Sequence, residues 1–413
     1  MGKRKVLFLT IALFYIAYII FPLFSDLTGI PVYVPSLVVF IGLIAMYPFA
    51  FQQTMFRWFV VYAVIAIAYV MIGKPLAIGI GTVEDSKKII IEFAFILPSL
   101  SIYLVLKSLE DTRLKRIIGF CSLTMLVLSF LYIIPLMSIS ENILRDAESL
   151  ELEEEITIPG LPGYGLMHAY TLLIPALCYG VRIQHGKYRF LMLLILAVYC
   201  FVVTRTSVTT SIVLMVFILA FSLFYSERNV ISTVFTLSLL AFLVYLFYLA
   251  DGFVLLIDWL TPFFEGTAVE PKIVDLKYSM TVGHIEGETF TNRQDLHQQS
   301  WDCFFQNPLF GTENVGGHSN VIDRLGGMGL IGAVPYFMIF VVYFKEIKMF
   351  FEPRTARVFA YLTFLIAFIY LYQKGNWSDS NWLFLLVLAP AVLQIFVKGE
   401  AINELNEEES NKS

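Results

Sequence analysis

The chain has 413 residues, of which 58% are hydrophobic and 15% charged; its formal net charge is −5 and its mean hydropathy is +0.76. Soluble globular proteins are about 45–50% apolar and about 25% charged, so this composition excludes an ordinary cytosolic enzyme, a nucleic-acid-binding protein and a disordered protein. It predicts an all-α polytopic membrane protein, and the four cysteines have no spacing that indicates a disulfide framework.

Apolar runs long enough to cross the hydrocarbon core as helices recur along the chain. They predict about twelve membrane spans, nine within residues 1–257 and three within 325–397, with a long polar stretch at 258–324 and an acidic tail at 398–413. The predicted spans cover 6–24, 33–51, 56–73, 88–106, 117–138, 165–181, 190–204, 208–225, 230–250, 325–344, 356–372 and 381–397. Because the run 190–225 is too long for one span, we expect two spans that meet at 205–207.

The basic residues predict the orientation of these spans. The apolar run after the basic start of the chain is too long for a signal peptide and has no small-residue cleavage site, so we expect a retained first span. With that basic end inside, 18 of the 28 Lys and Arg residues fall on the inner side, although the outer loops are longer, in agreement with the positive-inside rule. Both termini are therefore expected to be cytoplasmic.

Two polar segments are expected on the outer side. Residues 139–164 are rich in Glu and then in Pro and Gly, a pattern that a solvated acidic surface loop explains. Residues 258–324 form the longest polar stretch of the chain, too short for a typical domain and too long for a simple connection. Long loops of this kind usually carry function.

Arg205 lies between two long apolar runs. A charged side chain at mid-bilayer costs roughly 2.5 kcal/mol or more, so intramembrane charge is by default a functional-site hypothesis. We interpret Arg205 as a cation facing an anionic group at membrane level, with Thr204, Thr206 and Ser207 as neighbouring hydroxyl donors. The alternative is an arginine that snorkels from a tight outer turn.

The long outer loop contains a predicted helix of about four turns, which starts at a capping box of Thr291 and Gln294 and stops at Asn307-Pro308. Arg293 and His297 are four residues apart and share a face. A basic residue in the first turn opposes the helix dipole, which indicates a ligand; an ordinary surface arginine with a solvated histidine fits the spacing as well. An apolar side that we expect to lie on the membrane domain is formed by Leu296, Trp301, Phe304 and Phe305.

A glycine-rich stretch leads from this loop into the next span. Gly316 and Gly317 allow a tight turn that leaves His318 at the mouth of the span, and Arg324 follows as a candidate substrate ligand. Histidine titrates near neutrality, so His318 can take a proton from a sugar hydroxyl; a loop histidine bonded to backbone carbonyls is the alternative. Close helix packing is expected at Gly326, Gly327, Gly329 and Gly332.

Other chemistries have no motif in this sequence. The histidines and glutamates of the long loop lack the spacing of a zinc site, so we expect no metal. There is no phosphate-binding glycine loop and no Gly-x-Ser-x-Gly elbow. Since no inner segment is long enough to bind a nucleotide sugar, any enzymatic chemistry is expected on the outer side.

The residues of the long loop follow a recognisable order. Arg293, Trp301, Asn-Pro-Leu-Phe-Gly at 307–311 and His318 resemble the Arg…Trp…Pro-Leu-Phe-Gly…His-Asn order of the O-antigen polymerase and O-antigen ligase superfamily of bacterial membrane glycosyltransferases. Gly-Leu-Ile-Gly at 329–332 then enters a helix, as the family pattern does.

The match extends to Arg205, which resembles the arginine that the family carries in a Thr-x-Ser-Arg-like turn between two spans. Two positions depart from the pattern. Thr204 precedes Arg205 where the family has serine, and Ser319 separates His318 from Asn320.

The resemblance implies transfer of a saccharide from undecaprenyl diphosphate at the periplasmic face of the bacterial inner membrane, beneath a helical periplasmic loop. It implies that Arg205 and Arg293 hold the diphosphate, that His318 serves the acceptor hydroxyl, and that no metal or other cofactor is needed. Further candidate substrate-binding residues are His297, Arg324, His168 and Tyr164. The implied partners are the lipid-linked donor, a saccharide acceptor, the bilayer, a chain-length regulator and a flippase, and no nucleic acid.

A polymerase, which joins lipid-linked repeat units into O-antigen or capsular polysaccharide, is favoured because every surface-polysaccharide system needs one. An O-antigen ligase, which moves the polymer to lipid A–core, shares the donor chemistry. A polysaccharide or small-solute transporter would place ionisable residues near mid-membrane on several helices, whereas Arg205, Glu92 and the charges of the long loop gather towards the outer boundary. A purely structural scaffold leaves Arg205 unexplained.

Overall fold

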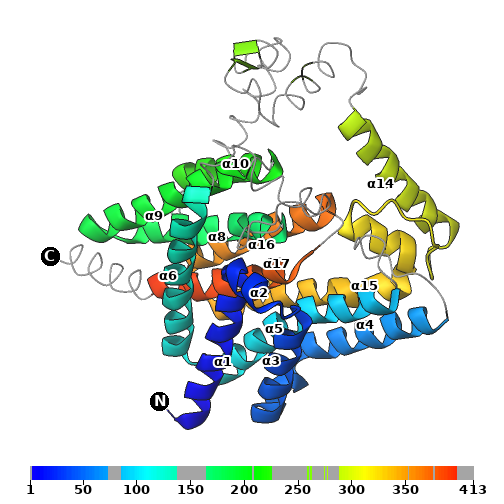
Figure 1. The fold of residues 1–413 in the computed structure, drawn as a ribbon, viewed down its shortest axis with the longest axis horizontal. Coiled ribbons are helices and arrows are strands. Elements are labelled where there is room, and N and C mark those ends of the chain that lie inside the picture. The colour runs from blue at the N-terminus through cyan, green and yellow to red at the C-terminus, as the bar shows by residue number, and fades with distance from the viewer. Residues whose placement is uncertain are drawn as a thin grey trace.

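A computed structural model describes residues 2–72, 85–136, 164–206, 209–225, 288–351, 353–374 and 377–397, with a few isolated positions between 258 and 277. All regular structure in these residues is helical (Figure 1). The elements are α1 (Lys3–Ile20), α2 (Pro22–Thr28), α3 (Tyr33–Met46), η1 (Pro48–Gln52), α4 (Thr54–Met71), α5 (Asp85–Leu109), α6 (Thr112–Leu136), α8 (Tyr164–Ile183), α9 (Gly186–Arg205), α10 (Thr209–Phe224), α14 (Glu288–Gln306), α15 (Asn320–Phe350), α16 (Arg354–Gln373), α17 (Asp379–Leu383) and the π-helical turn η3 (Phe384–Leu388).

Eight helices in the described part of the chain are long and apolar enough to cross a membrane, and α1 with α2, which meet at 95°, would make a ninth. Helices α3 and α10 are apolar but shorter. Described helices lie over eleven of the predicted spans, while the predicted span 230–250 lies outside the described residues. The polytopic helical class is therefore confirmed, and the total of about twelve spans stays a prediction.

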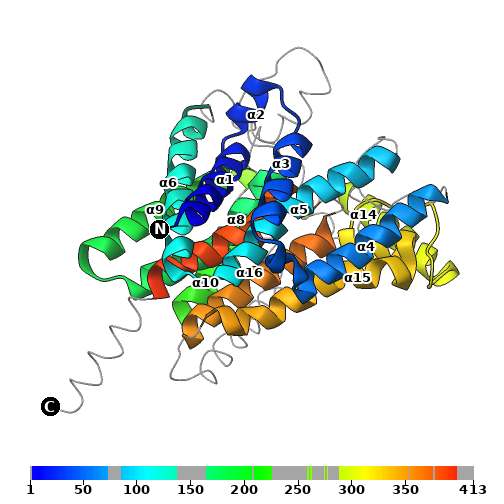
Figure 2. The same ribbon diagram turned by 90° about the horizontal axis from the view of Figure 1, so that it is seen from below.

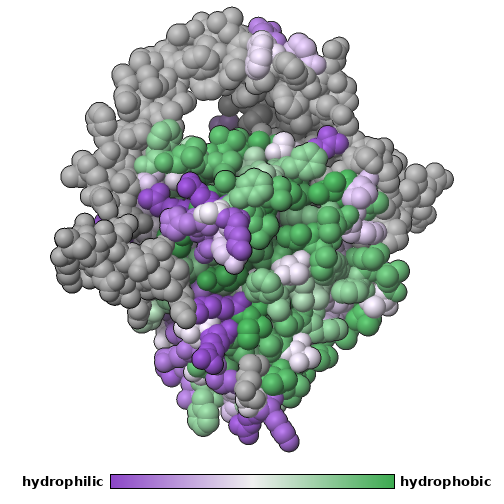
Figure 3. Space-filling view, turned by 90° about the vertical axis from the view of Figure 1, so that its left-hand side faces the viewer, coloured by the Kyte–Doolittle hydropathy of each residue, from purple (hydrophilic) through white to green (hydrophobic). Residues whose placement is uncertain are grey.

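Burial separates central from peripheral helices. In their most apolar stretches, 83% of the α8 residues and 89% of those in the helix that begins with α17 are buried, against 28% for α4 and α9. Large apolar side chains such as Phe14, Phe190 and Leu223 are exposed on the lateral surface, and Figure 3 shows hydrophobic side chains covering much of one face beside hydrophilic patches. Apolar surface on this scale suits contact with lipid.

One end of the bundle gathers basic residues; we call it the basic end. Lys5 pairs with Asp111 at 2.5 Å between α1 and α6, and Lys107 of α5 pairs with Glu346 of α15 at 2.5 Å. The hydrogen bond from Lys5 holds the pKa of the Asp111 carboxyl below its usual value. These cations come from segments that the charge distribution predicts on the inner side.

The opposite end, which we call the site end, brings together segments predicted on the outer side. The first turn of α8 meets the start of α17, where Gly165 contacts Ser378. The backbone N–H of Asn320, at the start of α15, donates to the Lys374 carbonyl just after α16 at 2.8 Å. Helix α14 packs on α15 at this same end (Figure 1).

Candidate functional site

Helix α15 is interrupted at Gly329. This residue has φ +59° and ψ −168°, and a Cβ at this position would lie 2.4 Å from the backbone of Leu309. Only glycine adopts such a backbone without strain, and no side chain fits the space. The first part of α15, 320–328, is therefore separated from the part that continues to Phe350.

The loop that follows α14 fills this interruption. The N–H of Leu330 donates to the Pro308 carbonyl at 2.8 Å, the N–H of Ile331 to Leu309 at 3.2 Å, and the N–H of Thr312 to Gly326 at 2.8 Å. The Tyr69 hydroxyl of α4 donates to the Met328 carbonyl at 2.8 Å and lies 3.2 Å from that of Phe310. Backbone groups freed by the break are thus satisfied, as membrane depth requires.

A buried carboxylate ties α14 to the start of α15. The Ser300 hydroxyl of α14 donates to Asp323 Oδ1 at 2.6 Å, and the Ser319 N–H donates to Asp323 Oδ2 at 2.8 Å. Ser300 Oγ in turn accepts the Gly316 N–H at 2.8 Å. The glycine-rich loop before His318 is therefore held in place from both sides.

Next to this junction, Arg324 is completely buried, and each of its three guanidinium nitrogens donates a hydrogen bond. Nη2 donates to Glu92 Oε1 of α5 at 2.6 Å and Nη1 to the Tyr62 hydroxyl of α4 at 2.5 Å. Nε donates to Asn320 Oδ1 at 3.0 Å, and the Tyr336 ring stacks 3.7 Å from the guanidinium carbon. A buried charge is tolerated only with partners of this quality.

This cluster corrects the expected position of Arg324. Arg324 was expected in the loop as a substrate ligand, but α15 begins at Asn320 and Arg324 points its charge to protein groups with none of its surface exposed. Arg324 instead fixes the position of the start of α15. The ion pair of Arg324 with Glu92 was not predicted, although two opposite charges at similar depth in apolar helices were the available signal.

Arg205 is the last residue of α9, half-buried, and α10 begins at Thr209, so the predicted break between two helices at this arginine is confirmed. For Thr204 and Thr206, two of the three hydroxyl donors predicted beside it, the prediction is wrong. Thr204 donates to the Cys200 carbonyl at 2.8 Å and Thr206 to that of Val203 at 2.7 Å, so both hydroxyl protons are used within their own helix. Ser207 lies outside the described residues.

Helix α14 begins at Glu288 rather than at Thr291, so the predicted capping box is wrong, while its end at Gln306 agrees with the stop predicted at Asn307-Pro308. Arg293 lies in the second turn, and its side chain is outside the described part of the structure. The buried side of this helix carries Ser300 and Cys303, whereas 69% of Phe305 is exposed. The expected apolar contact with the membrane domain is thus made only in part.

His297 lies half-buried on α14, with its ring 6.0 Å from the Tyr372 ring at the end of α16. Its Nε2 is buried and has no hydrogen-bond partner among the described residues. An unpaired buried ring nitrogen is costly, so this atom marks a place where a ligand group can bind.

His318 is exposed two residues before α15, after the left-handed Gly317 at φ +77°. Ser319 between them caps α15 by accepting the Ile322 N–H at 3.2 Å. The predicted position of His318 at the mouth of a span is therefore confirmed.

Two candidate substrate-binding residues, Tyr164 and His168, lie on α8. Tyr164 is the first residue of the helix, and its side chain is outside the described part. His168 is buried against Tyr370 of α16, with ring centroids 5.0 Å apart. The Tyr370 hydroxyl is 2.7 Å from Ser211 Oγ and 3.0 Å from Thr171 Oγ1, which makes a polar layer inside the bundle.

An apolar groove of about 340 Å³ runs between α15 and α16, which lie side by side (Figure 2). It opens sideways, because 44% of Phe344 and 46% of Phe368 are exposed. At the site end its lining includes Val321, two residues after Ser319, and Leu371, whose neighbour Tyr372 contacts the His297 ring. It is lined by Val321, Phe337, Phe340, Val341, Phe344, Phe364, Phe368 and Leu371.

The break in α15 can be tested through its glycine. Gly329→Ala is expected to lower the unfolding midpoint of the purified protein in detergent, because a left-handed backbone costs a non-glycine residue about 1–2 kcal/mol and the added Cβ displaces the loop. The control is Gly42→Ala in the middle of α3, where the Cβ would meet only Ile11 Cδ1 at an ordinary 3.6 Å. Equal midpoints for the two variants would contradict this account of the break.

No cluster of three or more possible metal ligands occurs in the described ranges, and the loop residues 278–287 lie outside them. The four histidines that can be placed, His168, His185, His297 and His318, lie on four different segments. No protein-family model matches the chain, and no curated protein matches it by sequence.

Proposed function

We propose that this protein is a polytopic membrane glycosyltransferase that takes a saccharide from a polyprenyl-diphosphate donor, as polymerases and ligases of O-antigen and capsular polysaccharide do. The observation that carries this proposal is the groove between α15 and α16, which is apolar and open to the side. It reaches Val321 near the start of α15 and Leu371 near the end of α16, where the neighbouring Tyr372 ring meets that of His297. A lipid with an apolar chain and a polar head fits an apolar groove that leads to polar residues.

The groove suits the lipid part of the donor. Its lining is formed by five aromatic or branched side chains of α15 and three of α16. An isoprenoid chain can enter it from the bilayer without crossing water. The head of the same lipid then lies at the site end, beside the buried Nε2 of His297.

The arginines supply the charge that this head requires. Arg205 lies at the end of α9, and Arg293 lies on α14, four residues before His297. Guanidinium groups bind phosphate oxygens bidentately and stabilise the charge that develops on a departing diphosphate. Arg324 takes no part in this contact; it holds the start of α15 against α4 and α5.

The reaction then needs one proton transfer. The acceptor hydroxyl oxygen forms a bond to the anomeric carbon of the donor sugar, and the bond from that carbon to the diphosphate oxygen breaks, with its electron pair leaving on the diphosphate. The hydroxyl proton passes to a base, a role for which His318 is exposed at the mouth of α15.

The same proposal includes a topology. About twelve spans are expected, with both termini cytoplasmic and the basic end inside, so that the site end faces the periplasm of a bacterial cell. The protein then works in the inner membrane with a flippase that delivers the donor and a regulator that sets chain length.

The break in α15 favours a second candidate, a transporter, because discontinuous helices line the binding sites of many transporters. Two features weigh against it. The break is filled by backbone of residues 308–312 rather than by a cavity, and all three guanidinium nitrogens of the buried Arg324 already donate to protein groups.

The test uses the full-length protein in vesicles with undecaprenyl-diphosphate-linked repeat units. A ladder of longer lipid-linked saccharides from these units alone is the expected result and identifies a polymerase. Product that forms only after lipid A–core is added identifies a ligase. No product under either condition, with transmembrane movement of the lipid-linked unit, would overturn the glycosyltransferase and support the transporter.

A further inference from the structure

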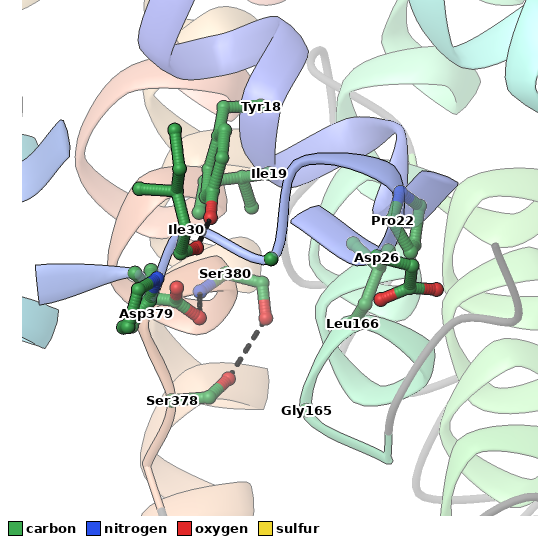
Figure 4. Close-up of a pocket in the computed structure, with 13 residues that line it drawn as sticks. Tyr18, Ile19, Pro22, Asp26, Ile30, Gly165, Leu166, Ser378, Asp379 and Ser380 are labelled. Atoms are coloured by element: carbon green, nitrogen blue, oxygen red, sulfur yellow. Dashed lines mark hydrogen bonds between the residues drawn. The ribbon is translucent and has the colours of Figure 1, made fainter. Parts of the chain in front are cut away.

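A second cavity at the site end has a different chemistry from the apolar groove. It encloses about 600 Å³, the size of an ordinary small-molecule site, between the end of α1, the start of α2, residues 29–32, the start of α8 and the start of α17. Figure 4 shows Asp26 of α2 across the cavity from Ser378 and Ser380 at the start of α17. We call this cavity the acidic pocket.

The polar groups of the acidic pocket are hydroxyls and carboxylates. Ser378 Oγ and Ser380 Oγ are 2.8 Å apart, and Asp379 Oδ1 accepts the Ser380 N–H at 2.6 Å. Tyr18 donates its hydroxyl to the Ile30 carbonyl on the other wall. No Lys, Arg or His is among the described residues that line the cavity, so its charge comes from Asp26 and Asp379.

The walls of the pocket are held by local contacts. Ser378 caps α17 by accepting the Asn381 backbone N–H at 3.5 Å, and it also accepts the Asn381 side-chain amide at 3.1 Å. A Cβ on Gly165, in the first turn of α8, would lie 2.2 Å from Ser378 Oγ, so only glycine lets α8 approach this closely. The Ser378 and Ser380 hydroxyls and the Asp379 carboxylate are therefore set in place before a ligand binds, which lowers the cost of binding.

The acidic pocket also adjoins the donor site. Its α17 wall begins four residues after Lys374, whose carbonyl accepts the Asn320 N–H at the start of α15. One short segment thus connects the pocket with the segment that carries His318. A ligand in the pocket and a donor head at the groove mouth lie at the same end of the bundle.

We infer that the acidic pocket binds the acceptor saccharide and selects one without anionic groups. This inference rests on the proposed function. Ionised carboxylates only accept hydrogen bonds, and sugar hydroxyls donate them. A uronic acid or a phosphorylated sugar would be repelled by Asp26 and Asp379, so the pocket selects among acceptor sugars by their charge.

The test measures binding, so that it does not depend on turnover. The probe is the saccharide pool released by mild acid from the lipid-linked fraction of cells that make this protein, divided by anion exchange into neutral and acidic fractions. Saturation-transfer NMR with the full-length protein in detergent is expected to detect the neutral fraction. Asp26→Asn with Asp379→Asn should weaken that binding by about tenfold or more, the loss expected for charge-assisted hydrogen bonds.

The matched control is Asp302→Asn, which removes one carboxylate from an exposed position on α14 and should leave binding unchanged. Gly165→Ala, which pushes Ser378 into the pocket, should weaken binding without any change of charge. Binding of the acidic fraction instead of the neutral one, or neutral binding that survives the Asp26 and Asp379 changes, would overturn the inference. Neutral binding in a protein that forms no product would leave the pocket standing and refute the proposed function alone.

Discussion

Alanine in place of Arg205, Arg293 or His318 is expected to reduce saccharide transfer by about 100-fold or more in each case. Loss of one preorganised hydrogen-bond donor typically lowers the rate by about 10²–10³-fold, and loss of a general base lowers it by about 10²–10⁴-fold. Arg205 lies at the end of α9 and His318 is exposed at the mouth of α15, so neither truncation opens the buried core. The measurement is product formed from lipid-linked repeat units in vesicles.

The control for these variants is Arg189→Ala, which removes an exposed arginine from the basic end of the same helix α9. It should leave transfer unchanged. All variants should insert into the membrane in equal amounts. Normal product from Arg205→Ala, Arg293→Ala and His318→Ala together would refute the catalytic assignment.

Glu92→Ala is expected to destabilise the protein more than any other single change at the site end. Arg324 has no exposed surface and the Glu92 side chain has 6%, so truncation leaves a buried guanidinium without its counter-charge. Breaking such a pair from one side costs about 3–5 kcal/mol in proteins where it has been measured. The unfolding midpoint of purified protein in detergent, and the amount inserted in membranes, report this loss.

Two comparisons isolate the charge effect. Replacing both partners, Arg324→Met with Glu92→Leu, should recover much of the lost stability because no unpaired charge remains. Asp111→Asn breaks the Lys5 pair, in which the side chains are 36% and 22% exposed, and should cost only about 0–1 kcal/mol. If Glu92→Ala proves as harmless as Asp111→Asn, the ion pair does not hold α5 and α15 together.

The features that were predictable from the sequence depend on local pattern. Apolar runs located the helices, the charge of Arg205 marked the turn between α9 and α10, and Asn307-Pro308 marked the end of α14. The pair of glycines before His318 indicated a tight turn, and Gly317 adopts a left-handed backbone there. Each of these signals acts within a few residues of the chain, where steric and hydropathy rules apply directly.

The features that were missed depend on contacts between distant segments. Glu92 and Arg324 are 232 residues apart, and only the packing of α4 against both α5 and α15 brings them to 2.6 Å. The Pro-Leu-Phe-Gly loop was read as a motif of the site, but its backbone fills the break at Gly329. The acidic pocket was missed because its walls come from α1, α2, residues 29–32, α8 and the start of α17, and its two carboxylates lie on α2 and α17, far apart in the chain.

Cross-linking from the groove tests the central claim most directly, because it asks whether a polyprenyl lipid lies between α15 and α16. A photoreactive benzoylphenylalanine replaces Phe368 in the groove or Phe217 on α10, which have similar exposed fractions of 46% and 41%. The full-length protein is irradiated in vesicles with undecaprenyl-diphosphate-linked saccharide and excess phospholipid. We expect covalent polyprenyl adducts from position 368 and only phospholipid adducts from position 217. Phospholipid adducts alone from both positions would contradict the assignment of the groove.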